Sequence, residues 1–86
     1  MEIKYTSHFL NKLEDLFSES DFILRYEKGS FKAGYCVLKS NGIVVVNKYF
    51  TTEGKINAII EILRTVPINI EKMCEKNKSL FEQITK

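Results

Sequence analysis

The stretch Tyr35–Lys48, which reads YCVLKSNGIVVVNK, decides the fold of this chain. Two runs rich in β-branched and other apolar residues flank the dipeptide Asn41-Gly42. A two-residue type I′ hairpin turn needs positive φ at both central residues, and the pair Asn-Gly tolerates this best. We therefore predict an antiparallel hairpin with Asn41-Gly42 as its loop and with Ser40 opposite Ile43.

This register places alternate side chains on two faces of the hairpin. One face carries Cys36, Leu38, Ile43, Val45, Asn47 and Tyr49. The other face carries Tyr35, Val37, Lys39, Val44, Val46, Lys48 and Phe50. Because the first face has no charged residue, we expect it to pack against helices. The second face is half apolar, so we expect another molecule to cover it. The interaction surface predicted there consists of Tyr35, Val37, Val44, Val46 and Phe50.

A helix and a further strand are predicted before the hairpin. From about Thr6 to Ser18, apolar residues recur at helical spacing, and Thr6 or Ser7 is suited to cap the first turn. The run Phe22–Tyr26 is short and rich in aromatic and β-branched residues, which is typical of a strand.

Two more helices are predicted after the hairpin. The first spans about Glu53 to Thr65 and ends before Pro67, because proline cannot donate the helical hydrogen bond. The second spans roughly Asn69 to Ile84. The predicted fold class is therefore α+β in the order α-β-β-β-α-α, with a small antiparallel sheet packed on helices in a single domain of residues 1–86.

The composition is that of a small globular protein. The 86 residues include 13 Lys and Arg against 11 Asp and Glu, and 44% are hydrophobic, which excludes a disordered chain and a large enzyme. No stretch approaches the roughly 18 apolar residues of a membrane helix. Charged or polar Glu2, Lys4 and His8 interrupt the region where a secretory signal is apolar. We therefore expect a cytoplasmic protein without a membrane partner.

The residues that usually carry catalysis or bind metals are few. His8 is the only histidine, and Cys36 and Cys74 lack the paired spacing of a zinc site. Gly29 and Gly34 have the spacing of a phosphate-binding loop, but no Lys-Ser or Lys-Thr follows them. We expect no catalytic residue, no metal and no cofactor, and we predict that the chain is not an enzyme.

A local excess of lysines supports an alternative. Lys28, Lys32, Lys39 and Lys48 occur without any acidic residue between positions 28 and 52. Together with Tyr35 they indicate binding of an anion or a single-stranded nucleic acid by a basic sheet face. However, lysines also protect sheet edges from pairing with other molecules. Because a pI near 8.5 is low for a nucleic-acid module, a nucleic-acid partner is the less favoured interpretation.

The segments Arg25–Cys36 (RYEKGSFKAGYC) and Val44–Lys48 (VVVNK) resemble a family of short bacterial proteins of unknown function. The same stretch, continued through Arg64, is more distantly similar to the strand–helix lead-in of ImmA/IrrE-type zinc metallopeptidases. In those enzymes the helix carries HExxH, whereas this chain has Ile60 and Arg64 at the two histidine positions around Glu61. The resemblance implies the order of elements, and it implies no zinc site or peptidase activity.

Taken together, these features predict a non-enzymatic protein-interaction or structural module that self-associates. The expected partner is a second copy of the chain, since uncovered apolar surface favours association, and an unidentified protein partner also fits. Binding of an anion or single-stranded nucleic acid is the alternative function.

Overall fold

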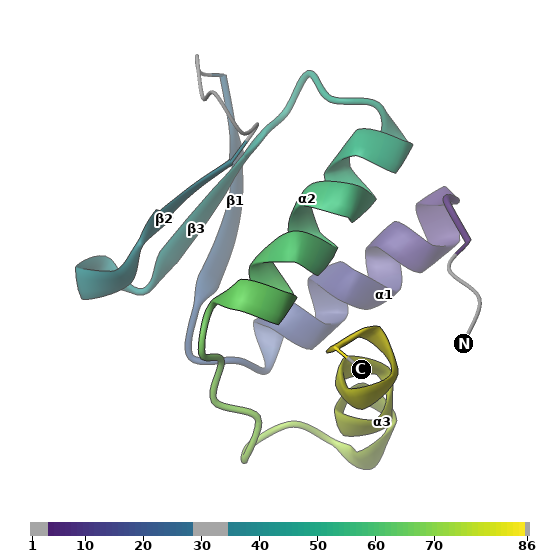
Figure 1. The fold of residues 1–86 in the computed structure, drawn as a ribbon, viewed down its shortest axis with the longest axis vertical. Helices are drawn as coiled ribbons and strands as arrows, with labels where there is room; N and C mark the ends of the chain where they lie inside the picture. The colour runs from purple at the N-terminus through teal and green to yellow at the C-terminus, as the bar shows by residue number, and fades with distance from the viewer. Residues whose placement is uncertain (1–3, 29–34, 86) are drawn as a thin grey trace.

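A computed structural model describes residues 4–28 and 35–85 of the chain. Its elements are α1 (Ser7–Ser18), β1 (Ile23–Glu27), β2 (Tyr35–Leu38), the short 3-10 helix η1 (Lys39–Asn41), β3 (Ile43–Asn47), α2 (Thr52–Thr65) and α3 (Glu75–Thr85). The predicted α+β class and the order α-β-β-β-α-α are confirmed. All three α-helices lie on one side of the sheet (Figure 1), and none of them covers its other face.

The three strands form a mixed sheet in the order β1-β3-β2. β2 pairs with β3 in antiparallel fashion, as predicted, but β1 pairs with β3 in parallel. The expectation of an entirely antiparallel sheet is therefore wrong. The central position belongs to β3, whose continuous apolar run Ile43–Val46 is typical of a strand with both faces shielded from water. Val44, Val45 and Val46 are indeed all buried.

The hairpin is present, but its register is shifted by two residues from the predicted one. Leu38, rather than Ser40, lies opposite Ile43, so the loop has four residues. Only Gly42 has positive φ, at 64°, among the described residues, whereas a type I′ turn also needs it at Asn41. The Gly42 carbonyl accepts a hydrogen bond from Ile23 N at 2.8 Å. The wider turn thus also contacts β1, and the sequence of the hairpin alone does not reveal this contact.

A shift of two residues keeps every side chain on its predicted face, yet the faces have exchanged roles. Val44 and Val46 are completely buried under the helices, and Tyr35 and Val37 pack against the same core. The chain itself therefore covers Val44 and Val46 of the predicted interaction surface completely, and Tyr35 and Val37 in part. The absence of charge was a misleading criterion, because Lys39 follows the last residue of β2 and Lys48 follows the last residue of β3, so neither belongs to the paired strands.

Phe50, the last member of that predicted surface, is also engaged within the chain. It lies just before α2 and is half-buried. A β-carbon added at Gly54 would lie 3.3 Å from the Phe50 ring, so the ring covers the first turn of the helix. Glycine at this position allows the close approach of the ring to the backbone.

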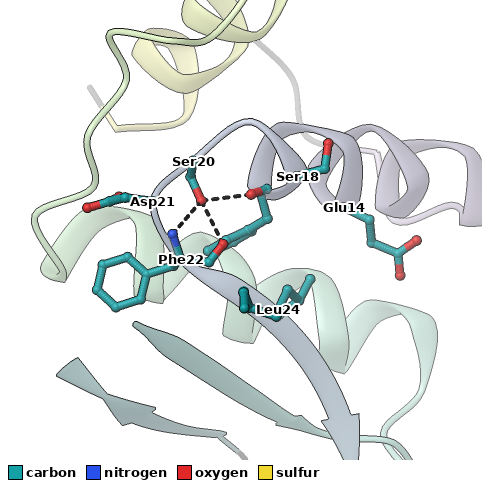
Figure 2. A pocket seen from close by; sticks show the side chains of 8 residues that line it. Glu14, Ser18, Ser20, Asp21, Phe22 and Leu24 are labelled. Carbon is teal, nitrogen blue, oxygen red and sulfur yellow. Dashed lines mark hydrogen bonds between the residues drawn. The ribbon is translucent and has the colours of Figure 1, made fainter. Parts of the chain in front are cut away.

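Local side-chain hydrogen bonds start the first two helices and the first strand. Thr6 Oγ1 accepts from Phe9 N, and Thr51 Oγ1 accepts from Gly54 N, both at 3.1 Å. These are the N-terminal caps of α1 and α2. Between α1 and β1, the Ser20 hydroxyl donates to the Phe17 carbonyl at 2.7 Å and accepts from Phe22 N at 3.1 Å (Figure 2). The chain thus reverses within a few residues.

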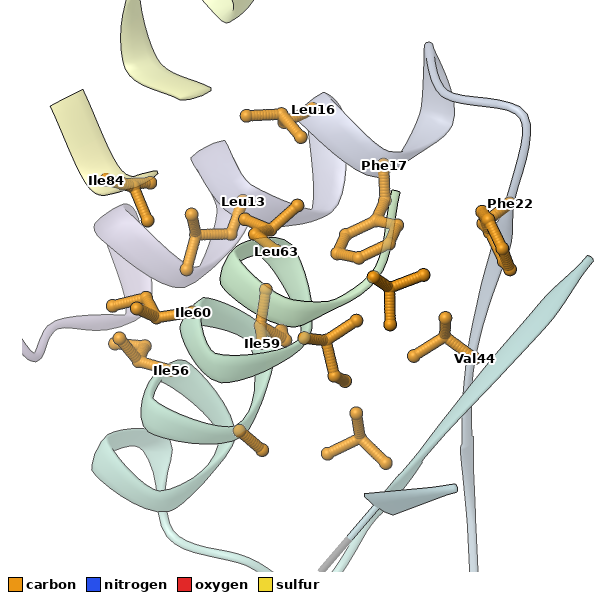
Figure 3. Close-up of a cluster of buried hydrophobic side chains, with 14 of the residues drawn as sticks. Leu13, Leu16, Phe17, Phe22, Val44, Ile56, Ile59, Ile60, Leu63 and Ile84 are labelled. Carbon is orange, nitrogen blue, oxygen red and sulfur yellow. The ribbon is translucent and has the colours of Figure 1, made fainter. Parts of the chain in front are cut away.

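The core lies between the sheet and the helices (Figure 3). Its fully buried members include Leu13, Leu16, Phe17, Val44, Val46, Ile56, Ile59, Ile62 and Ile84. They come from α1, β3, α2 and α3, so each of these elements contributes its apolar side to one cluster.

α3 begins later than predicted, at Glu75 rather than near Asn69. Two acidic side chains hold the preceding loop in a non-helical path: Asp21 Oδ1 accepts from Asn69 N at 3.0 Å, and Glu19 Oε1 accepts from Cys74 N at 3.2 Å. The helix packs on its own chain, because Ile84 is fully buried in the common core. No helix within the described residues is long and apolar enough to cross a membrane.

Candidate functional site

The candidate site is the face of the sheet that no described helix covers, here called the open face. Residues directly opposite each other on paired strands share a face. The open face carries Ile23, Arg25 and Glu27 from β1, Ile43, Val45 and Asn47 from β3, and Cys36 and Leu38 from β2. The side chains between them on each strand point into the core.

An apolar row crosses all three strands at one end of the open face. It consists of Ile23, Ile43 and Leu38, which lie side by side in the register of the sheet. Ile23 is 61% exposed and Leu38 is 42% exposed. Exposed apolar side chains on neighbouring strands form a contiguous patch, which is typical of a surface that contacts another molecule.

The next row contains Arg25, Val45 and Cys36. Val45 is only 6% exposed, although it belongs to the open face and not to the core cluster. Arg25 Nε lies 3.8 Å from Glu27 Oε2, and both side chains are about half exposed, at 56% and 50%. A single ion pair of this length on the surface contributes little to stability. Arg25 and Glu27 can therefore form stronger ion pairs with groups of another molecule.

Cys36, Leu38, Ile43, Val45 and Asn47 share one face, as predicted, but the expectation that helices cover this face is wrong (Figure 1). The β1 residues Ile23, Arg25 and Glu27 were not among the residues predicted for it. Their alternation with Leu24 and Tyr26 was the available signal, because it places both charges opposite the apolar side chains of the strand.

The predicted basic face does not form within the described residues. Lys28 follows β1 and Lys48 follows β3, so these two exposed lysines lie at the same end of the parallel pair. Lys39 lies in η1, at the opposite end of the sheet. At about 3.3 Å per residue, the length of a strand separates it from the other two. Lys32 lies outside the described residues.

The hollow at the junction of α1 and β1 has a volume of about 320 Å³ and is lined by Glu14, Phe17, Ser18, Ser20, Asp21, Phe22, Ile23 and Leu24 (Figure 2). Its polar groups already have structural partners. Ser20 bonds to the backbone, Asp21 holds Asn69, and Glu14 Oε2 accepts from the Tyr26 hydroxyl at 2.5 Å. The polar groups of the hollow therefore hold elements of the fold together.

Tyr26 connects three elements beside this hollow. Its hydroxyl donates to Glu14 of α1, and Lys55 Nζ of α2 lies 5.0 Å from the centre of its ring. Burial raises the pKa of Tyr26, and the hydrogen bond to the Glu14 carboxylate raises the pKa further. The phenol therefore stays protonated at neutral pH and acts as a hydrogen-bond donor.

The remaining candidate residues are dispersed. His8 is exposed in the first turn of α1, Cys36 is half-buried on the open face and Cys74 is exposed before α3. Within residues 4–28 and 35–85, no three His, Cys, Asp or Glu side chains come together in a way that could hold a metal ion.

Ile60 and Arg64, which occupy the histidine positions of the metallopeptidase pattern, serve the fold. Ile60 is buried in the core, and Arg64 Nε donates to the Ile84 carbonyl at 2.9 Å. The strand and the helix that the resemblance implies are present in this region as β3 and α2, and Thr51 caps the helix. Comparison of the chain with protein-family models, curated proteins and solved structures finds no match. The resemblances described above therefore remain predictions from the sequence.

Proposed function

We propose that this chain is a non-enzymatic protein-interaction module that self-associates through the open face of its sheet. The observation that carries this proposal is the row Ile23, Ile43 and Leu38, which leaves apolar side chains of all three strands without a covering helix. The surface differs from the one that the sequence predicted, but the physical reason is the same: uncovered apolar area favours association.

The charges beside this row favour a second copy as the partner. Arg25 and Glu27 lie on the same face, two residues apart, so this pair adds no net charge to it. In a two-fold symmetric dimer every contact occurs twice. Arg25 of one copy and Glu27 of the other would therefore form two equivalent ion pairs, better shielded from water than the single exposed pair within one chain.

The energy available is sufficient for a dimer of moderate strength. Burial of apolar area contributes about 25 cal/mol per Å², so covering a few hundred Å² favours association by several kcal/mol. The loss of translational and rotational freedom opposes this gain. We therefore expect dimerisation at micromolar rather than nanomolar concentration.

The proposal is tested by the replacement Ile23→Lys. This residue is 61% exposed, so the replacement should leave the fold intact while placing a charge in the apolar row. Sedimentation velocity at micromolar concentration should show dimers for the unmodified chain and monomers for Ile23→Lys.

The matched control is Tyr5→Lys, which also replaces an exposed apolar residue, 45% exposed, at the start of the chain next to α1. It should dimerise like the unmodified protein. A monomeric unmodified chain, or equal effects of the two replacements, would contradict the proposal.

A further inference from the structure

The outer edge of β1 is a second candidate site, separate from the open face. β1 pairs with β3 along one of its edges, and no strand of the described residues pairs with the other. Ile23 N donates to the Gly42 carbonyl at 2.8 Å, and Lys48 N donates to the Glu27 carbonyl at 3.2 Å. Because these two bonds lie at the two ends of β1, they show that its odd-numbered residues bond to β3.

Leu24 and Tyr26 therefore direct their backbone N–H and carbonyl groups to the outer edge. None of these groups has a hydrogen-bond partner in the part of the chain that the structure describes. A row of unpaired backbone groups is a template for pairing with a further strand, and proline or charged side chains commonly protect it. β1 contains no proline, and its charges Arg25 and Glu27 lie on the open face. The edge can therefore accept an added strand.

The hollow between α1 and β1 lies along this edge. Its lining comes from α1, β1 and the turn between them and includes no residue of β3, so it lies on the side of β1 away from β3 (Figure 2). Leu24 lines it and points to the helical side of the sheet. In an added strand, the residue opposite Leu24 would point to the same side, so its side chain would enter the hollow. Sites for drug-sized ligands begin at about 300 Å³, so a hollow of about 320 Å³ has room for one long side chain.

The hollow carries negative charge, because Glu14 and Asp21 are the charged residues of its lining and no lysine or arginine belongs to it. Each carboxylate uses one oxygen for the fold: Glu14 Oε2 accepts from the Tyr26 hydroxyl, and Asp21 Oδ1 accepts from Asn69 N. Among the described residues, no Lys or Arg nitrogen lies within 4 Å of either carboxylate. Lys55 contacts the Tyr26 ring, 5.0 Å from its centre, and does not line the hollow. A cation that enters the hollow would therefore meet carboxylate oxygens without an ion-pair partner.

We propose that the outer edge of β1 binds an extended peptide segment of another protein, antiparallel to β1 and with an arginine opposite Leu24. The backbone of the segment would bond to Leu24 and Tyr26, which provides affinity, and the arginine side chain in the hollow would provide specificity. Antiparallel pairing is slightly more stable per residue than parallel pairing. Arginine suits the hollow better than lysine does, because its planar guanidinium has five donors that match carboxylate oxygens. This site does not depend on the proposed self-association.

The test is a titration of the whole chain with the blocked pentapeptide Thr-Val-Arg-Val-Thr, followed by amide chemical shifts and hydrogen exchange. The bound peptide should slow exchange of the Leu24 and Tyr26 amides, whereas the Arg25 amide, which faces β3, should change little. Absence of saturable shifts at millimolar peptide would overturn the proposal. If the Leu24 and Tyr26 amides are already protected in the free chain and lose this protection on dilution, a second copy occupies the edge, which would also overturn it.

Two altered peptides separate strand addition from attraction of charge. A peptide methylated at the arginine nitrogen keeps its charge but lacks the N–H that pairs with the Leu24 carbonyl, so it should bind at least tenfold more weakly. A peptide with glutamate in place of arginine should show no saturable shifts, because the hollow is acidic. Equal binding of the methylated peptide would show that charge alone attracts the segment and would overturn the proposal.

Variants of the chain locate the arginine. Glu14→Gln and Asp21→Asn should each weaken binding of the arginine peptide about fivefold, because an amide oxygen accepts a weaker bond from a guanidinium than a carboxylate does. Both amides keep an oxygen that can accept the bond made in the fold. Glu82→Gln removes the same charge at an exposed position of α3, outside the hollow, and should leave the affinity unchanged. Equal weakening by all three variants would overturn the proposal. Circular dichroism checks that each variant is folded.

Discussion

Gly42 determines the geometry of the hairpin loop. Its φ of 64° is unfavourable for a residue with a β-carbon, and a β-carbon placed there would lie 3.3 Å from the Asp21 carbonyl oxygen. The position is also fixed from outside the hairpin, by the hydrogen bond from Ile23 N to the Gly42 carbonyl. A change at Gly42 therefore affects both the loop and its contact with β1.

We predict that Gly42→Ala lowers the free energy of unfolding by about 1–2 kcal/mol, the cost of a left-handed conformation for a residue other than glycine. Urea denaturation measures this effect. Ser40→Ala is the matched control in the same loop, because exposed positions usually change stability by less than about 0.5 kcal/mol. Equal stability of the two variants would show that the loop tolerates a β-carbon at Gly42.

Glu19 joins α1 to the start of α3. The hydrogen bond from Asn77 lowers the pKa of Glu19 below its ordinary value of 4.5, and the bond from the Cys74 backbone lowers it further. The folded state therefore binds a proton at Glu19 less readily than the unfolded state does. The stabilisation is present in full above the unfolded pKa and is lost as the pH falls through the lower folded pKa.

We accordingly predict that the unfolding free energy decreases as the pH is lowered from about 5 towards 3. In Glu19→Gln this decrease should be smaller, because the titrating group is absent. Denaturation curves over this range provide the measurement. If Glu19→Gln shows the same pH dependence as the unmodified chain, Glu19 does not contribute to it.

At the scale of elements, the sequence predicted α1 and α2 nearly to their ends. Their caps, Thr6 and Thr51, and their apolar stripes are local signals. The start of α3 was placed too early because Asp21 and Glu19, distant in sequence, hold the preceding loop. These tertiary hydrogen bonds have no local signature.

The open face was only partly predictable for a similar reason. Alternation along the hairpin grouped the residues of β2 and β3 correctly, since a register error of two residues leaves the faces unchanged. Ile23, Arg25 and Glu27 join that face only because β1 pairs in parallel with β3. A parallel pairing of strands distant in sequence leaves no turn signal from which it can be predicted.

Docking of α3 depends on Ile84, which is 1% exposed at the end of the helix. We predict that Ile84→Ala lowers the unfolding free energy by about 2–5 kcal/mol, the range for removal of a buried isoleucine side chain. Gln83→Ala, next to it on the exposed side, is the control and should have little effect. Thermal denaturation of both variants distinguishes a helix that contributes to the core from one that does not.

At the scale of the whole molecule, the three helices and the sheet form two sides with different character. The helical side consists of α1, α2 and α3, whereas the sheet side presents the open face (Figure 1). A dimer formed through the open face would therefore leave the helical side uncovered.

The most direct test of self-association through the open face is sedimentation equilibrium of the unmodified chain, Arg25→Glu and the double variant Arg25→Glu/Glu27→Arg. If Arg25 of one copy contacts Glu27 of the other, the unmodified chain should form a dimer. The single variant should raise the dissociation constant of this dimer at least tenfold. The double variant should restore the original dissociation constant, because opposite charges face each other again. An unmodified chain that is monomeric, or a double variant as weak as the single one, would contradict this arrangement.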